Sequence, residues 1–293
     1  MSSGRDLAAA PARAGNGAAS LPSQRLHALR RRLSGLIVGP LYRLYERRLM
    51  RSLRNAPIPR HVGIILDGNR RYGRRAGLTD PASLYLPGAE KLDDVLDWCG
   101  ALAIPAVTLW VCSTDNLDRA PAEVAGILGA VSGKLQALAA DPHTARRGVR
   151  VQAIGRLDLL PPETRAAIAA VEAATARHTR LTLTIAIAYG GREEIADAVR
   201  ALLRREAAQG ATLEQAIAAV STDSIARHLY LAAAPELDLI IRTSGELRLS
   251  GFLLWQSAYS EFHFTDVLWP AFRKIDFLRA VRAFQDRRRR FGK

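Results

Sequence analysis

The 293-residue sequence predicts an α/β fold, in which helices flank a central, mostly parallel sheet and a flexible basic tail precedes it. After Pro59, short apolar runs alternate with longer segments of helical period, a pattern typical of parallel sheets with right-handed crossovers. Hydrophobic residues make up 48% of the chain, which is enough for a sizeable core. Residues 1–32 are expected to be a disordered basic tail because Ala, Gly, Ser, Pro and Arg recur there without a period.

Residues 33–58 predict an amphipathic lead-in helix. Apolar residues recur there near helical spacing, namely Leu41, Leu44, Tyr45, Leu49 and Leu53. Arginines fill the other face, and residues 1–60 carry twelve Arg against two acids, so +10 of the formal charge of +14 lies there. We favour packing of this helix against the following domain. Peripheral binding to the inner face of a membrane is the alternative.

The remaining residues, 59–293, are expected to form one catalytic domain. Five apolar runs predict its strands, in order residues 61–66, 105–112, 149–154, 181–188 and 237–242. Helical segments follow them at 88–101, at 121–140 with Pro121 in the first turn, from Pro161, and from about residue 192.

Several classes of protein are disfavoured by composition. Cys99 and Cys112 form neither a zinc motif nor a disulfide framework. No apolar run reaches the ~18 residues of a membrane span, and the start lacks a signal-peptide layout, so we expect a cytoplasmic protein. Because the basic excess lies in the tail and no nucleic-acid-binding motif is present, nucleic acid is not an expected partner.

The residues that follow four of the predicted strands indicate a site for diphosphates. These segments are residues 67–71, 113–119, 189–192 and 242–250, and they contain arginines, glycines and small hydroxyls. Ligands bind at the carboxyl ends of strands in open α/β sheets. Arginine forks bind phosphate oxygens, and glycine lets backbone N–H groups approach them.

A magnesium ion is the expected cofactor at this edge. Asp67 can ligate Mg²⁺, which takes one or two carboxylates together with substrate phosphates. Glu261 is the second acid that we expect near the metal. Histidines in these loops are too few for a zinc hydrolase, and no nucleophile elbow is present.

These loops lie within four longer stretches: HVGIILDGNRRYGRRAG, TLWVCSTDNLDRAPAEV, IAIAYGGREEI and DLIIRTSGELRLSGFLLWQSAYSEFHFTDVLWP. In this order and at this spacing they resemble the signature regions of the cis-prenyltransferase (undecaprenyl diphosphate synthase) family. The resemblance covers about residues 59–293. The chain looks closest to the short-chain Z,E-farnesyl diphosphate synthases of actinobacteria, an impression that the PLYRLYE lead-in supports.

The resemblance implies an enzyme that joins isopentenyl diphosphate to an allylic prenyl diphosphate, and it implies a homodimer. Asp67 matches the metal-associated aspartate that assists departure of the allylic diphosphate, and Glu261 matches the second metal-associated acid. The loop that cradles the allylic diphosphate comprises Gly68, Asn69, Arg71 and Tyr72, to which we add the neighbouring Arg70. Further matched residues are Ser113, Asn116 and Arg119 for positioning and condensation; Arg242, Arg248 and Ser250 for isopentenyl diphosphate; and Arg290 and Gly292, which reach a partner's site.

The chain departs from the family at three positions. Tyr85 stands where long-chain members have His, Leu117 replaces a Trp, and Leu247 replaces a His. These changes affect product length and primer choice more than reaction type. Val111 lies two residues before Ser113 and would share its face of a strand, so its size is expected to help set product length. Asn116 or a diphosphate oxygen could assist loss of the C2 proton.

Other functions stay open at this point. They are a longer-chain polyprenyl diphosphate synthase, an irregular prenyl-coupling enzyme and a non-catalytic partner subunit. A separate motif, Asp93-Asp94-Val95-Leu96-Asp97, matches the DDxxD of the all-helical trans-prenyltransferases. Since those enzymes use two such motifs, we interpret this one as a solvated helix face.

Overall fold

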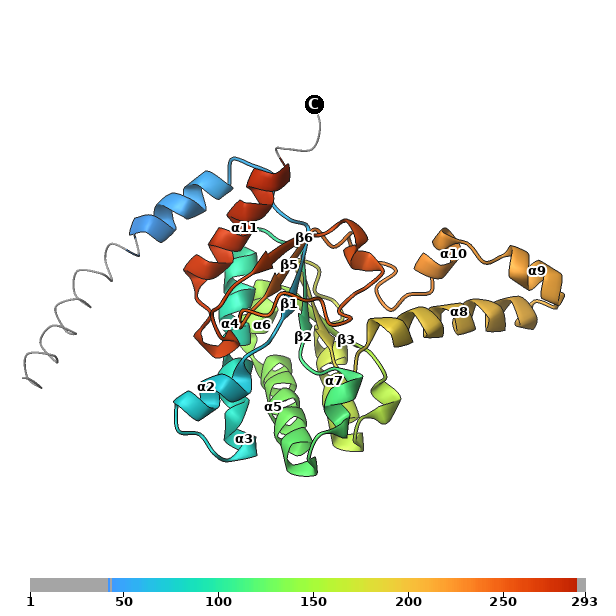
Figure 1. Cartoon of the computed structure of the whole chain (residues 1–293), viewed down its shortest axis with the longest axis horizontal. Helices are drawn as coiled ribbons and strands as arrows, with labels where there is room; N and C mark the ends of the chain where they lie inside the picture. The colour runs from blue at the N-terminus through green and yellow to red at the C-terminus, as the bar shows by residue number, and fades with distance from the viewer. Residues whose placement is uncertain (1–41, 43, 289–293) are drawn as a thin grey trace, which may run out of the picture. The chain divides into compact units, whose positions relative to one another are not determined.

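The computed structural model describes residue 42 and residues 44–288 (Figure 1). The expected tail, the first part of the lead-in helix, Arg290 and Gly292 lie outside the described residues. A compact unit begins at Arg48. Residues 44–53 are helical, and Leu49 and Leu53 are buried in the core of this unit. No helix in the described part of the chain is long and apolar enough to cross a membrane.

The strands of the described chain form one parallel sheet in the order β3-β4-β2-β1-β5-β6. All five predicted strands are present, most of them shorter than expected. The strands are β1 (His61–Ile65), β2 (Ala106–Trp110), β3 (Val149–Ile154), β4 (Leu181–Ala186), β5 (Leu239–Arg242) and β6 (Glu261–Phe264). The edge strand β6 was not predicted. Because β1 lies between β2 and β5, the loops after these three strands are neighbours.

Helices connect the strands, as the alternating pattern predicts. The first group is α2 (Asn69–Arg75), α3 (Pro81–Leu84), α4 (Leu86–Ala101), α5 (Pro121–Ala140), α6 (Pro142–Arg147) and α7 (Pro162–Thr175). The second is α8 (Gly191–Ala208), α9 (Leu213–Ala218), α10 (Thr222–Ala226) and α11 (Lys274–Arg288). Proline in the first turn of α5 and of α7 suits a position whose N–H has no helical partner. Figure 1 shows α8 extending from the sheet, with α9 and α10 beside it.

Alternate residues of the strands enter two cores, one on each face of the sheet. Ile64 and Ile241 belong to the larger core, which α4, α5, α7 and α11 also line. Ile65 and Ile240 belong to the smaller core, with Tyr189 and Phe252. Both faces of the central part of the sheet are therefore largely apolar, which explains why its inner strands appear as mostly apolar runs.

The DDxxD motif lies on α4, as a charged helix face. Its carboxylates form ion pairs with basic side chains of α4, α5 and α6, namely Asp94 with Lys91, Asp93 with Lys134, and Asp97 with Arg147. This agrees with the interpretation that the motif is structural.

Candidate active site

A charged pocket lies at the carboxyl ends of β1, β2 and β5. Asp67, Ser113 and Asn116 line it, as do Gly68 and Asn69. Six arginines also line it: Arg70, Arg71, Arg74, Arg119, Arg242 and Arg248. With two carboxylates lining the same pocket, its charge is strongly positive, which suits an anionic ligand.

Asp67 is held at the centre of the pocket by residues that follow β5. Arg242 Nη2 donates a hydrogen bond to Asp67 Oδ2 at 3.0 Å, and Thr243 Oγ1 accepts one from the Asp67 N–H, also at 3.0 Å. Arg242 is only 4% exposed, and its Nη1 donates to Ser250 Oγ at 2.8 Å. These contacts fix both the carboxylate and the guanidinium before any ligand arrives.

Two buried polar atoms of the pocket have no hydrogen-bond partner within the described chain: Arg242 Nε and Asn69 Oδ1. Buried polar atoms of this kind are rare in folded proteins and often mark a functional site. An unpaired guanidinium N–H in a positive pocket is a donor that phosphate oxygens can use.

The turn after β1 requires glycine at position 68. Gly68 has φ of 108°, and a Cβ there would lie 2.9 Å from Leu268. This turn starts α2 at Asn69, whose Nδ2 donates to Leu66 O at 3.2 Å. The helix α2 therefore begins at the edge of the sheet where the arginines gather.

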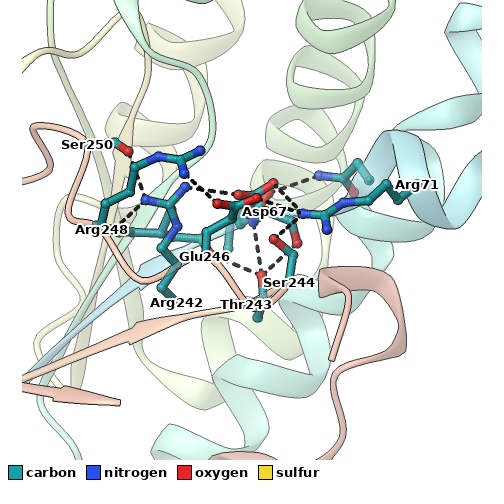
Figure 2. A network of polar contacts seen from close by, with 11 residues as sticks. Asp67, Arg71, Arg242, Thr243, Ser244, Glu246, Arg248 and Ser250 are labelled. Carbon is teal, nitrogen blue, oxygen red and sulfur yellow. Dashed lines mark hydrogen bonds and ion pairs between the residues drawn. The ribbon is translucent and has the colours of Figure 1, made fainter. Parts of the chain in front are cut away.

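Arg71 and Arg248 meet at a second carboxylate, Glu246 (Figure 2). Arg71 Nη2 lies 3.8 Å from Glu246 Oε1 and 3.8 Å from Asp67 Oδ1, and it donates to Ser244 Oγ at 2.6 Å. Arg248 Nη1 donates to Glu246 Oε2. Glu246 stands inside the Arg-Thr-Ser-Gly-Glu segment after β5 but was not among the predicted site residues.

Ser113 and Asn116 are fixed by a reciprocal cap at the start of a 3₁₀ helix, Thr114–Asp118. Ser113 Oγ accepts from the Asn116 N–H, and Asn116 Oδ1 accepts from the Ser113 N–H, both at 3.2 Å. Each side chain thus orients the other at the pocket wall.

Glu123 on α5 gathers three side chains at the pocket mouth. Its Oε1 accepts from Tyr85 at 2.7 Å and from Arg119 at 2.8 Å, and Arg70 Nη1 lies 3.6 Å away. Burial opposes ionisation of Glu123, but these hydrogen bonds and charges outweigh it and lower the pKa of the carboxyl. Burial and the bond to Glu123 raise the pKa of Tyr85 to about 12. Arg119, a predicted site residue, and Tyr85, which stands where long-chain family members have His, therefore belong to one hydrogen-bond network.

An apolar cavity adjoins the charged pocket. Its lining includes Leu92, Leu109, Val131, Leu135 and Ile185. Some residues line both spaces: Leu66, Asn69, Tyr85, Val111 and Ile127. A ligand with an anionic head and an apolar tail would fill the two together. Val111 lines both spaces, but β2 ends at Trp110, so Val111 and Ser113 follow the strand and do not share one of its faces as predicted.

The single chain does not bring Glu261 to Asp67. Glu261 opens β6 and lies beside Leu239, the first residue of β5, whereas Asp67 follows the end of β1. Glu261 is ion-paired with Arg287 at 3.0 Å. The expected pair of metal acids is thus separated along the strands, because β6 runs parallel to β5 and starts at the opposite edge. Tyr72, also predicted, is half-buried on α2 and outside the lining of the charged pocket.

The residues of the pocket fit a magnesium ion that is bound with its substrate. No group of three or more His, Cys, Asp or Glu in the described part of the chain could hold a metal alone. Asp67 offers a carboxylate beside arginines that suit phosphate. Mg²⁺ usually takes one or two carboxylates and completes its shell with phosphate oxygens and water.

The fold and this site define a class of protein: an α/β protein with a diphosphate-type pocket that opens into an apolar cavity. A family model described as "Putative undecaprenyl diphosphate synthase" matches residues 65–292. The chain belongs to this prenyltransferase family.

Several relatives are similar over most of their length. The (2Z,6E)-farnesyl diphosphate synthase of Thermobifida fusca is 53% identical over 88% of this chain and 99% of its own. An isoprenyl transferase of Deinococcus radiodurans is 54% identical over 87% of this chain and 93% of its own. The solved lavandulyl diphosphate synthase of Lavandula x intermedia, in complex with dimethylallyl diphosphate, superposes with a TM-score of 0.70 at 28% identity and covers 78% of this chain and 95% of that one.

Proposed function

We propose that the chain is a Mg²⁺-dependent cis-prenyltransferase that condenses isopentenyl diphosphate with an allylic prenyl diphosphate and releases diphosphate. The observation that carries this proposal is the continuity of the charged pocket with the apolar cavity through Asn69, Tyr85 and Val111. An allylic diphosphate has the same two parts. The family and the names of the relatives support the same reaction class.

The proposed chemistry uses the fixed charges of the pocket. When bound, Mg²⁺ would neutralise negative charge on the departing diphosphate, with Asp67 holding it. Arg70 and Arg71 stabilise the same charge as the allylic C–O bond breaks. The isopentenyl double bond attacks the allylic carbon as the diphosphate leaves, and a C–C bond forms. One C2 proton then passes to a diphosphate oxygen, or leaves with assistance from Asn116, to give the Z alkene.

The isopentenyl diphosphate is assigned to Arg242, Arg248 and Ser250. Arg242 is buried and bonded to Ser250 Oγ, so these two donors are fixed, whereas the side chain of Arg248 is exposed. Ser113, Asn116 and Arg119 on the neighbouring loop would position the reacting carbons. Glu261, Arg290 and Gly292 would act, on this proposal, across a homodimer, since the single chain leaves Glu261 away from Asp67.

For the particular reaction we propose geranyl diphosphate as primer and Z,E-farnesyl diphosphate as product. Two relatives at 53% and 47% identity carry the name (2Z,6E)-farnesyl diphosphate synthase. A cytoplasmic location, with peripheral contact of the basic N-terminal segment at the membrane, stays a prediction from the sequence.

A product assay tests the proposal. The full chain would be incubated with Mg²⁺, labelled isopentenyl diphosphate and, separately, dimethylallyl, geranyl or farnesyl diphosphate, and products would be resolved by length and double-bond geometry. We expect Z,E-farnesyl diphosphate from geranyl diphosphate and loss of product in Asp67→Ala. Glu214→Gln, an exposed change on α9, is the matched control and should retain activity.

Other products would change the assignment in defined ways. A ladder of long polyprenyl products from farnesyl diphosphate would identify a longer-chain synthase. Branched products from dimethylallyl diphosphate alone would identify irregular coupling. No condensation with any primer would contradict the enzyme proposal and favour a non-catalytic partner subunit.

A further inference from the structure

Glu246 joins two arginines that belong to different parts of the site. Its Oε1 lies 3.8 Å from Arg71 Nη2 on α2, while its Oε2 accepts a hydrogen bond from Arg248 Nη1 in the loop after β5. Each carboxylate oxygen therefore contacts one arginine, as Figure 2 shows. The proposed function assigns Arg71 to the allylic diphosphate and Arg248 to isopentenyl diphosphate, and the inference below rests on that assignment.

The two arginines are far more exposed than Arg242 and can exchange partners, although Arg71 also donates to Ser244 Oγ. The side chains of Arg71 and Arg248 are 46% and 64% exposed, whereas that of Arg242 is 5% exposed and bonded to Asp67 and Ser250. Carboxylate and phosphate oxygens bind a guanidinium with the same geometry. Glu246 thus contacts donors that both diphosphates need.

We propose that Glu246 couples the binding of the two diphosphates. Each ligand must displace the same carboxylate from one arginine. When the first diphosphate takes its arginine, Glu246 loses one of its two contacts and is repelled by the new negative charge. The carboxylate then leaves the other arginine more easily, and the second diphosphate binds more tightly than it would alone.

The size of the effect follows from the exposure of the pairs. Ion pairs as exposed as these are weak, so Glu246 should contribute about two- to fivefold to the coupling factor. Coupling between two ligands is reciprocal at equilibrium. The allylic ligand should therefore tighten isopentenyl diphosphate by the same factor by which isopentenyl diphosphate tightens the allylic ligand.

Calorimetric titration of the full chain measures this factor. Isopentenyl diphosphate would be titrated in Mg²⁺ with and without saturating geranyl S-thiolodiphosphate, an unreactive analogue, and the reverse titration would test reciprocity. The readout is the ratio of the dissociation constant of one ligand measured alone to that of the same ligand measured with the other ligand at saturation. It would be compared in wild type, Glu246→Gln, Glu246→Ala and the control Glu214→Gln.

We expect both Glu246 variants to lower this ratio about two- to fivefold relative to wild type and Glu214→Gln to leave it unchanged. A general loss of negative charge would tighten each ligand but would not alter the ratio, so an unchanged ratio overturns the inference. Weaker binding of both ligands in Glu246→Gln would also overturn it, and loss of that difference when the titrations are repeated with EDTA in place of Mg²⁺ would make Glu246 a metal ligand. If the wild type binds neither ligand, the proposed function fails as well.

Discussion

The conformations of single side chains in the pocket are fixed by contacts with their neighbours. Asn69 is held by its bond to Leu66 O on one side and by Gly88 on the other. A Cβ at Gly88 would lie 2.2 Å from Asn69 Oδ1, a distance that real atoms do not adopt. Gly88 is thus a positioning residue for Asn69, and glycine is needed there for close approach, because its backbone is that of an ordinary α4 residue.

Gly88→Ala should therefore displace Asn69. We expect kcat/KM to fall about tenfold, with most of the loss in kcat, because the allylic site is distorted rather than removed. The double variant Asn69→Ala/Gly88→Ala should be no worse than Asn69→Ala alone, since the clash is then gone. Additive losses in this double-mutant cycle would mean that Gly88 acts on something else.

Val111 lines both the charged pocket and the apolar cavity, so on the proposed function the product chain would pass it. Val111→Ala should enlarge the passage to the apolar cavity and shift the products toward chains at least one isoprene unit longer, which chromatography of the dephosphorylated products would show. Val124→Ala, the same change on α5 outside both spaces, should leave product length as it is. An unchanged product distribution in Val111→Ala would assign length control to other residues.

At the scale of elements, short helices and caps place the site residues. The reciprocal cap between Ser113 and Asn116 starts a 3₁₀ helix at the pocket wall, and a similar cap between Thr212 and Gln215 starts α9 away from it. The two caps have the same chemistry, so they allow a comparison of stability with function.

Removing each cap should cost about 1 kcal/mol of unfolding free energy or less. We expect Ser113→Ala also to reduce kcat/KM, because Asn116 loses its orientation, while Thr212→Ala keeps wild-type kinetics. Urea unfolding and steady-state assays of both variants would decide. Equal kinetic losses in the two variants would show that activity follows stability alone.

The elements predicted from the sequence were those with a strong pattern. Strands β1, β2 and β5 are buried almost throughout, so each is a nearly continuous apolar run, while β3 and β4 keep buried apolar residues at alternate positions. The edge strand β6 reads Glu-Phe-His-Phe, which alternates polar and apolar residues but is only four residues long and contains no buried residue, and it was not predicted. That omission also misplaced Glu261, since only the pairing of β6 with β5 shows which edge of the sheet it occupies.

The sequence could predict those site residues that come at the end of a strand or directly after it. Asp67, Ser113, Asn116 and Arg242 could be placed at one edge because parallel strands end together. The contact of Arg242 with Asp67, 175 residues apart, depends on the neighbouring positions of β1 and β5, which no local pattern shows. Glu123 and Glu246 were missed for the same reason, because their importance lies in which arginines they meet.

Across the whole molecule, the two edges of the sheet differ in chemistry. The edge where strands start carries His61, which is 2% exposed, with Nδ1 3.1 Å from Pro235 O and Nε2 2.7 Å from Thr108 Oγ1. Because a carbonyl only accepts, Nδ1 carries the proton and Nε2 accepts from the threonine hydroxyl. Burial lowers the pKa of His61 below its usual 6.5, against smaller opposing effects of Pro235 and Asp238.

This lowered pKa makes stability depend on pH. Below about pH 6.5 the unfolded chain binds a proton at His61, whereas the folded chain does not bind it until the pH is lower. The unfolding free energy should therefore decrease as the pH is lowered, by at most about 1.4 kcal/mol per pH unit for this group. Burial lowers the pKa of His263 in the same sense. Urea unfolding from pH 8 to 5 should show the decline, and His61→Gln should reduce its slope. An unchanged slope in that variant would exclude His61 as a source.

The separation of these two edges has a consequence for engineering. His61 and the charged pocket lie at opposite ends of β1, a strand of five residues and thus about 16 Å long. Active-site residues usually limit how far an enzyme can be stabilised, because fixed charges and tight turns are kept there for function. Here a designer can repack the starting edge around His61, Thr108 and Pro235 for acid tolerance and leave the catalytic loops untouched.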